Sequence, residues 1–302
     1  MDRLKPAFAP EWVALAALAM LDAVWARAIG FHLTLSWGDG KLVAAGIAVM
    51  LALKIFAQPR FAKGGVMAEY FSLTTAAALV FAVLSYLSLA SSRALVDAPL
   101  MAADRALGFD WMAGYHFLKA SPAIALMLKF AYESMVYQGL YFCVLFALMD
   151  DRRNLRDMFW LVLVTGLVTS AGVLLFPAFG PFKALNMAPA GSFLPEMEHI
   201  KSGHDLNFAL ARMTGVVSFP SFHTSMALAY VWGFRKTGPI FWAIAALNAL
   251  MLLSIPWYGG HYLVDMIGGA LSMLAALALV RGAPALWTRL TAPILQPTLA
   301  NR

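Results

Sequence analysis

Long apolar runs recur along this chain and restrict what it can fold into. A helix needs about 20 apolar residues to cross a bilayer. Eight runs approach that length, at 12–29, 42–57, 70–90, 124–148, 158–176, 221–235, 240–257 and 262–280. Only 13% of the residues are charged, against about a quarter in soluble domains. The sequence therefore excludes a soluble enzyme. It predicts an all-α integral membrane protein with a bundle of about eight transmembrane helices. A count of six or seven helices remains an alternative, because two of the runs are short.

The joints between the runs carry the positive charges that predict orientation. Lys and Arg are retained on the cytoplasmic side of a membrane. With eight spans, that side receives Arg60, Lys63, Arg152, Arg153, Arg156, Arg235, Lys236, Arg281 and Arg289. The long joints 91–123 and 177–220 then face outward. We expect a protein of the plasma membrane, the inner membrane of a bacterium. Its net charge of +6 reflects this topology, and nucleic acid is not expected as a partner.

Two segments with ionisable residues lie at the outward ends of the last helices. They read Phe-Pro-Ser-Phe-His-Thr at 219–224 and Tyr-Gly-Gly-His-Tyr-Leu-Val-Asp at 258–265. Pro220 and Ser221 predict that a helix starts near Ser221. His223 and His261 are 38 residues apart, about the length of two helices that cross the membrane and return. Both histidines are therefore expected at the same depth on the outward face.

The second segment predicts a base together with a group that orients it. His261 and Asp265 are four residues apart and share one face of a helix, so the carboxylate is placed to accept the proton of one imidazole nitrogen. The N-termini of the two helices add unpaired N–H groups and positive dipole ends, which bind phosphate. We therefore predict a phosphate between two histidines. Tyr258 and Tyr262 are interpreted as interfacial anchors.

These residues resemble the motifs of the phosphatidic acid phosphatase type 2 superfamily of membrane phosphoesterases. The Pro-Ser-x-His motif matches residues 220–223, and the Ser-Arg-x5-His-x3-Asp motif matches Ser254, His261 and Asp265. The resemblance implies that His261 attacks phosphorus to form a phosphohistidine. It also implies that His223 protonates the leaving alcohol and that Asp265 orients His261.

The same resemblance implies a division of the chain. A catalytic core of six membrane helices is expected at 70–280. An N-terminal cytoplasmic end and two extra transmembrane helices precede it at 1–69, and a cytoplasmic tail follows at 281–302.

Two departures from the superfamily motifs bear on the reaction. Ile255 stands where the phosphatases have an arginine, and their Lys-x6-Arg-Pro motif is missing. The sequence is more similar to the branch that contains inositol phosphorylceramide synthase, and residues 104–111 and 174–182 also resemble that branch. This implies headgroup transfer on a phospholipid or sphingolipid. The alternative is a lipid phosphate phosphatase with water as acceptor.

Other residues are candidates for holding the phosphate. Arg212 and Lys183 are the expected replacements for the missing cations, because they lie near the outward ends of the helices. Snorkelling of both side chains at the interface is an equally open interpretation. Ser221 is interpreted either as the helix cap or as a phosphate contact.

The run 124–148 contains a polar set at mostly three- and four-residue spacing. Its members are Lys129, Tyr132, Glu133, Tyr137, Gln138 and Tyr141. We interpret it as satisfied by an ion pair between Lys129 and Glu133 inside the bundle. The alternative is a polar wall that recognises a headgroup.

Two further functions compete with lipid phosphate chemistry. A transporter or flippase with a proton relay predicts paired discontinuous helices or inverted repeats, and neither is visible in the sequence. The second competing function is a metal site built from His223, His261 and Asp265. A His–Asp pair at i and i+4 is better suited to a proton relay than to metal ligation. We expect no metal and no cofactor, and Cys143, the single cysteine, allows no internal disulfide. The oligomeric state stays open.

Overall fold

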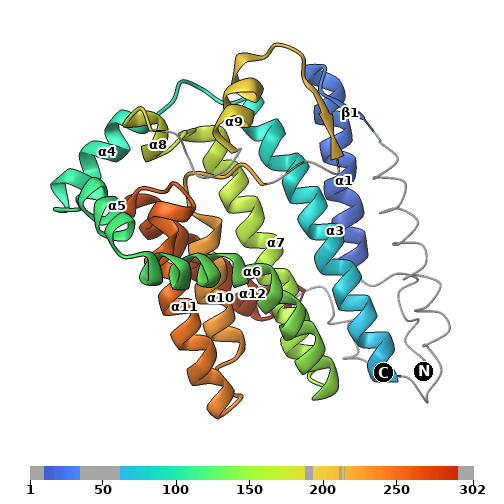
Figure 1. Cartoon of the computed structure of the whole chain (residues 1–302). Coiled ribbons are helices and arrows are strands. Elements are labelled where there is room, and N and C mark those ends of the chain that lie inside the picture. Colours follow the sequence, from blue (N-terminus) through green and yellow to red (C-terminus); the bar gives the residue numbers. More distant parts are fainter. Residues whose placement is uncertain (1–9, 35–61, 188–192, 211–212, 214, 292–302) are drawn as a thin grey trace, which may run out of the picture.

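The computed structural model describes residues 10–34, 62–187, 193–210, 213 and 215–291, and this part of the chain is almost entirely helical (Figure 1). Seven helices form a bundle: α1 (Pro10–Ile29), α3 (Ala62–Ala90), α6 (Pro122–Leu148), α7 (Arg152–Leu175), α10 (Phe222–Gly233), α11 (Pro239–Tyr258) and α12 (Leu263–Thr291). Four shorter helices connect them: α4 (Asp97–Ala106), α5 (Trp111–Ala120), α8 (Pro181–Ala184) and α9 (Phe193–Ser202). The all-α prediction is confirmed.

One small pairing of strands adds to the helices. Strand β1 (His32–Thr34) runs parallel to β2 (Asn207–Ala209), with Leu33 opposite Phe208. Strands of three residues leave no alternating pattern in a sequence, so this pairing was not predicted. It joins the segment after α1 to the segment before α10.

Five helices are long and apolar enough to cross a membrane, namely α1, α3, α7, α11 and α12. The chain is therefore an integral membrane protein, but the prediction of about eight spanning helices is wrong for the described residues. The predicted span 42–57 lies outside them. In α6, Lys129, Glu133 and Gln138 lower the hydropathy. Helix α10 has 12 residues, which is about 18 Å of helix against roughly 30 Å of hydrocarbon.

Helix α10 lies inside the bundle, with four other helices around it. It packs against α6, α7, α11 and α12, while α3 packs against α6 and α7 (Figure 1). The largest apolar core includes Phe142 and Phe146 of α6 and Phe234 just after α10, all at most 2% exposed. The surrounding helices therefore hold α10, which carries His223, in a fixed position.

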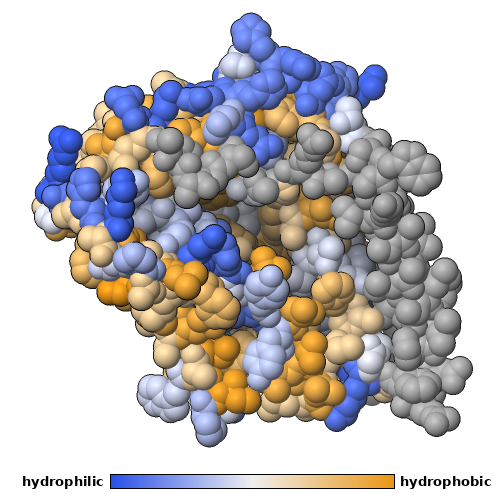
Figure 2. All heavy atoms as spheres, viewed as in Figure 1, coloured by the Kyte–Doolittle hydropathy of each residue, from blue (hydrophilic) through white to orange (hydrophobic). Residues whose placement is uncertain are grey.

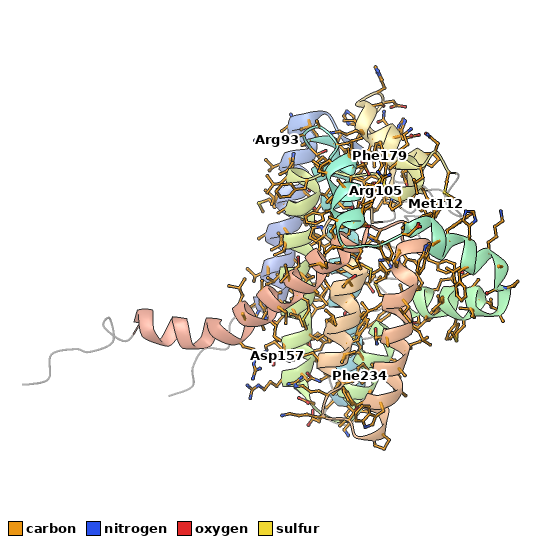
Figure 3. The ribbon with its side chains drawn as sticks, turned by 90° about the vertical axis from the view of Figure 1, so that its left-hand side faces the viewer. Arg93, Arg105, Met112, Asp157, Phe179 and Phe234 are labelled. Carbon is orange, nitrogen blue, oxygen red and sulfur yellow. The ribbon has the colours of Figure 1, made fainter. Side chains whose placement is uncertain are left out.

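The molecule has polar ends and apolar sides. The short helices α4, α8 and α9 gather at the top of Figure 1, and hydrophilic atoms gather along the same edge in Figure 2. Figure 3 shows Arg93 and Arg105 toward this end, with Asp157 and Phe234 toward the opposite end. Along the middle of the helices, apolar side chains such as Val136 of α6 and Leu274 of α12 are 71% and 57% exposed. This distribution suits a bilayer around the middle of the bundle.

The polar side chains of α6 do not form one self-contained set. Lys129 Nζ lies 3.7 Å from Glu133 Oε1, but these side chains are 53% and 59% exposed, so the pair lies on the surface and not inside the bundle. Gln138 is buried. It accepts a hydrogen bond from Asn248 of α11 over 2.6 Å and donates one to Ser134 over 3.0 Å. This network connects α6 to α11.

Candidate active site

Helix α10 begins with the side chain of Ser221 as its cap. Ser221 Oγ accepts a hydrogen bond from the N–H of Thr224 over 3.3 Å, and Ser221 is fully buried. The backbone N–H of Ser221 donates to the carbonyl of Asp265 over 2.9 Å. The cap that the sequence suggested is therefore present. The backbone bond fixes the start of α10 to the start of α12.

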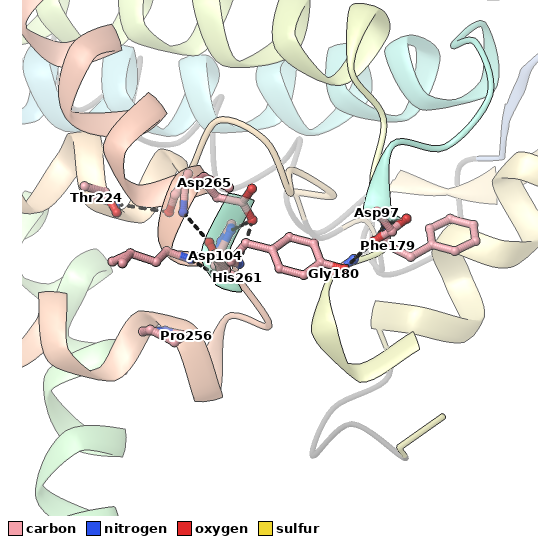
Figure 4. A network of polar contacts seen from close by, with 12 residues as sticks. Asp97, Asp104, Phe179, Gly180, Thr224, Pro256, His261 and Asp265 are labelled. Atoms are coloured by element: carbon pink, nitrogen blue, oxygen red, sulfur yellow. Dashed lines mark hydrogen bonds and ion pairs between the residues drawn. The ribbon is translucent and has the colours of Figure 1, made fainter. Parts of the chain in front are cut away.

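His261 and Asp265 form the buried pair that their spacing suggested. His261 Nδ1 lies 3.2 Å from Asp265 Oδ2, and the two side chains are 3% and 0% exposed (Figure 4). The same carboxylate oxygen accepts the N–H of Tyr262 over 2.9 Å. An ionised Asp265 can only accept, so in that state Nδ1 donates in this bond and Nε2 is the ring nitrogen that Asp265 leaves free.

Tyr132 of α6 lies next to both histidines. Its ring stacks on that of His223, with centroids 4.3 Å apart and planes inclined by 12°. A Cβ atom built on Gly259 would lie 3.2 Å from the Tyr132 hydroxyl oxygen and 2.6 Å from Cδ2 of His261. The three rings are therefore close together. Sequence reasoning missed this role, since Tyr132 and His223 are far apart in the chain and no local pattern joins them.

The two histidines line one cavity. Its volume is about 630 Å³, and Tyr132, Tyr258 and Gly260 line it as well. The structure thus brings His223 and His261 to one space, with Asp265 behind His261. Among the residues that the structure describes, no three His, Cys, Asp or Glu side chains are grouped so that they could hold a metal ion.

Asp104 caps the helix that follows His261. Its two carboxylate oxygens accept the N–H groups of Leu263 over 2.8 Å and Val264 over 3.0 Å, which are the first free donors of α12. Burial raises the pKa of Asp104, and the two N–H donors oppose that shift. Asp104 is the first residue of segment 104–111, which the sequence singled out only by its family resemblance. The structure shows that Asp104 caps α12.

Asp97 holds the other side of the same turn. It accepts the N–H groups of Phe179 over 3.0 Å and Gly180 over 2.7 Å, and the hydroxyl of Tyr262 over 3.0 Å (Figure 4). Burial and the neighbouring Asp97 raise the pKa of Tyr262, so its phenol keeps the proton that it donates. Tyr262 is 2% exposed, and the prediction that it anchors the chain at the interface is wrong.

A close contact between two glycines completes the turn. Gly180 has φ +88°, and a Cβ atom on it would lie 2.1 Å from the carbonyl oxygen of Gly260. Only glycine fits both the backbone angle and the space. The loop 177–180 therefore lies directly against the residue that precedes His261.

Removal of the Asp104 carboxylate is expected to disturb the turn without unfolding the bundle. In Asp104→Ala, two buried N–H groups of α12 lose their acceptor, which costs about 1 to 2 kcal/mol of stability. Loss of these bonds is also expected to shift the turn, and a displacement of His261 by about 1 Å lowers turnover by up to about 100-fold. Thermal melts and kcat/KM on any accepted lipid phosphate measure the two effects.

Asp110→Ala is the matched control, because it also removes a carboxylate cap, from α5, where Asp110 accepts from Ala113 N over 3.0 Å. Its kcat/KM should stay within about twofold of the parent protein. An equal loss in both variants would remove the special role of Asp104.

The candidate cations differ in where the structure places them. Lys183 forms an ion pair with Glu198 of α9, and its side chain is 50% exposed. It does not line the cavity of the histidines, and Arg212 lies outside the described residues. Ile255, at the position of the superfamily's arginine, is fully buried. Among the described residues that line the cavity there is neither Lys nor Arg.

The N-terminus of α12 is not open to a phosphate as the sequence suggested. Asp265 accepts the N–H of Tyr262, and Asp104 accepts those of Leu263 and Val264. Two carboxylates also offset the positive end of this helix dipole. The expectation of unpaired donors at both helix starts is therefore wrong for α12.

The part of the chain that carries both histidines matches one protein family. Residues 98–279 match the family model described as the PAP2 superfamily, and this match spans more than half of the chain. It covers α4 except its first residue, Asp97, and it includes α10 and both histidines. Comparison with curated proteins and with solved structures gave no match.

Proposed function

This chain belongs to the PAP2 superfamily, and we propose that it is a membrane-embedded lipid phosphotransferase that acts through a phosphohistidine. Membership of this superfamily implies lipid phosphatase or phosphotransferase chemistry. The observation that carries the proposal is the pair of imidazoles, His223 and His261, on the wall of one cavity. The hydrogen bond from His261 to buried Asp265 supports it as well.

The proposed reaction has two displacements at phosphorus. Nε2 of His261 attacks, the P–N bond forms, and the bond from phosphorus to the leaving oxygen breaks. His223 gives its proton to that oxygen. In the second step His223 takes a proton from the acceptor alcohol, whose oxygen then displaces His261. Asp265 holds Nδ1–H of His261 and balances the positive charge that develops on the ring.

We favour a phosphodiester donor over a phosphomonoester. The cavity has no Lys or Arg among its described lining residues, and Asp265 lies behind His261. A phosphomonoester carries up to two negative charges at neutral pH and a phosphodiester carries one, so the diester is the less costly guest where cations are scarce. This supports headgroup transfer of the kind catalysed by inositol phosphorylceramide synthase, with a phospholipid donor and a lipid alcohol acceptor. Hydrolysis by water is the alternative within the same site.

We place the site on the non-cytoplasmic side of the plasma membrane, the inner membrane of a bacterium. Arg152, Arg153 and Arg156 begin α7, at the end of the bundle opposite the short helices α4 and α8. Cationic residues favour the cytoplasmic side. The His261 turn is held by α4, so it belongs to the other side.

The test is turnover of defined lipids by the purified protein in vesicles. Radiolabelled phosphatidylinositol and phosphatidic acid are supplied with and without ceramide or diacylglycerol, and with a chelator in a parallel sample. A new phospholipid that requires the added alcohol is the expected product, at the same rate with chelator. Release of free phosphate indicates the phosphatase. Movement of lipid between leaflets without conversion contradicts both enzymes and indicates a flippase.

A further inference from the structure

The cavity of the histidines extends far below them. Tyr132, Met135, Val136, Gly139, Phe142 and Cys143 of α6 line it at three- and four-residue spacing, which is one face of the helix. Tyr132 stacks on His223, and Cys143 lies 11 residues further along α6. At 1.5 Å per residue these lining positions span about 17 Å of α6. One leaflet of hydrocarbon is roughly 15 Å thick, so this length is comparable with that of a membrane lipid chain.

The lower part of the cavity suits hydrocarbon and not a polar headgroup. Phe142 and Met158 line it, and the hydroxyls of Tyr230 and Thr74 on its wall are already bonded within the protein. The hydroxyl of Tyr230 donates to the carbonyl of Met135 over 3.0 Å, and that of Thr74 donates to the carbonyl of Tyr70 over 2.7 Å. An empty apolar space of this size would be strongly destabilising, and apolar cavities do not hold water well. A hydrocarbon chain removes both costs.

The cavity is open at its side and closed at its far end. Val136 of α6 is 71% exposed, and Thr74 and Ala78 of α3 are exposed as well, although all three line the cavity. A chain in the surrounding bilayer can therefore enter between α3 and α6. At the far end the lining residues Leu155 and Met158 of α7 are 2% and 6% exposed, so the protein interior stops the chain there.

We propose that this space, called the chain cavity below, takes one hydrocarbon chain of the lipid whose phosphate lies at His223 and His261, and that its closed end sets the chain length that the protein prefers. This inference rests on the proposed function for the position of the phosphate. The second chain of a two-chain lipid stays in the bilayer outside α3 and α6.

One experiment measures occupancy without turnover. A long-chain alkylphosphonate with a diazirine at the chain end is photolysed with the His261→Ala protein in vesicles, and the labelled residues are mapped by mass spectrometry. Label on α6 and α7 around Cys143 and Met158 is expected, and excess hexadecylphosphonate should remove it. Label confined to lipid-facing residues such as Leu140 would overturn the chain cavity.

A second experiment measures selectivity. Cys143→Phe fills the lower cavity. The measured quantity is the ratio of kcat/KM for a dipalmitoyl substrate to kcat/KM for a dihexanoyl substrate. This ratio should fall about tenfold, because about two methylene groups lose their burial. Leu140→Phe is the control, because Leu140 lies on the same helix, is 46% exposed and does not line the cavity. Met135→Phe, at a half-buried lining position, replaces Cys143→Phe if that variant does not fold.

The outcomes separate the two proposals. Photolabelling inside the chain cavity without turnover of any lipid phosphate contradicts the proposed function and leaves the cavity assignment in place. If the protein turns over lipid phosphates but neither Cys143→Phe nor Met135→Phe changes the dipalmitoyl to dihexanoyl ratio of kcat/KM, the chain cavity alone is contradicted.

Discussion

Replacement of His261 by alanine is expected to lower turnover of any accepted lipid phosphate by at least about 1,000-fold, because the proposed nucleophile itself is lost. The buried bond from Nδ1 to Asp265, at 3.2 Å, leaves Nε2 as the proposed attacking atom. Initial rates with radiolabelled lipid give the loss. Acid-labile label on the parent protein, absent from the variant, reports the phosphohistidine.

His223→Ala separates the two imidazole roles. With an ordinary lipid leaving group, loss of the proton donor should cost about 100- to 10,000-fold. With a nitrophenyl ester as leaving group, which departs without a proton, the variant should recover most of this loss, while His261→Ala should recover nothing. Equal behaviour of the two variants on both substrates would contradict the assignment.

His116→Ala is the matched control for both variants. His116 lies exposed on α5 and does not line the cavity of the histidines. Its removal should leave turnover within about twofold of the parent protein. A large loss in this variant would show that the assay responds to any missing histidine.

The meeting of the two histidines was predictable because the chain between them forms a helical hairpin that returns to its start. Helices α10 and α11 have 12 and 20 residues, so the hairpin is unequal, and both histidines still line one cavity. The i and i+4 spacing of His261 and Asp265 is equally local, and the structure shows the expected bond. Both inferences use only the geometry of a single helix or of one helical hairpin.

The residues that hold the His261 turn were not predictable in the same way. Asp97 and Asp104 reach it across more than 150 residues of sequence, and the family resemblance marked Asp104 without giving it a task. In the sequence, carboxylates in the first and last turns of a short helix such as α4 look like ordinary surface residues. The ion pair of Lys183 with Glu198 was not predictable for a related reason, since it depends on the placement of α9.

The helix count failed where tertiary context replaces hydropathy. Helix α10 is short, and α6 contains polar residues that bond to α11 and to its own turns. Neither helix has to satisfy the requirements of an isolated membrane span, because neighbouring helices cover much of their surfaces. A hydropathy pattern alone measures how well a helix would suit lipid on all sides.

Gly269→Val is expected to lower kcat/KM by about 100-fold or more while the protein still inserts and remains helical. A Cβ atom on Gly269 would lie 2.3 Å from the carbonyl oxygen of Ser221 and 2.9 Å from Cβ of Thr224, so α10 and α12 would have to move apart. That movement strains the bond from Ser225 Oγ to the Gly269 carbonyl, now 2.7 Å. Overpacking of this kind costs about 1 to 3 kcal/mol.

The loss in this variant should be catalytic as well as structural. The starts of α10 and α12 carry His223 and Asp265, and a separation of about 1 Å between reacting groups is enough for a 100-fold effect. Turnover, circular dichroism and thermal melts are measured together with Gly64→Val, where a Cβ atom meets nothing within 4 Å. The control also introduces a β-branched residue in a helix, so it corrects for helix propensity. Full activity of Gly269→Val would show that the close crossing of α10 and α12 does not set the distance between the two histidines.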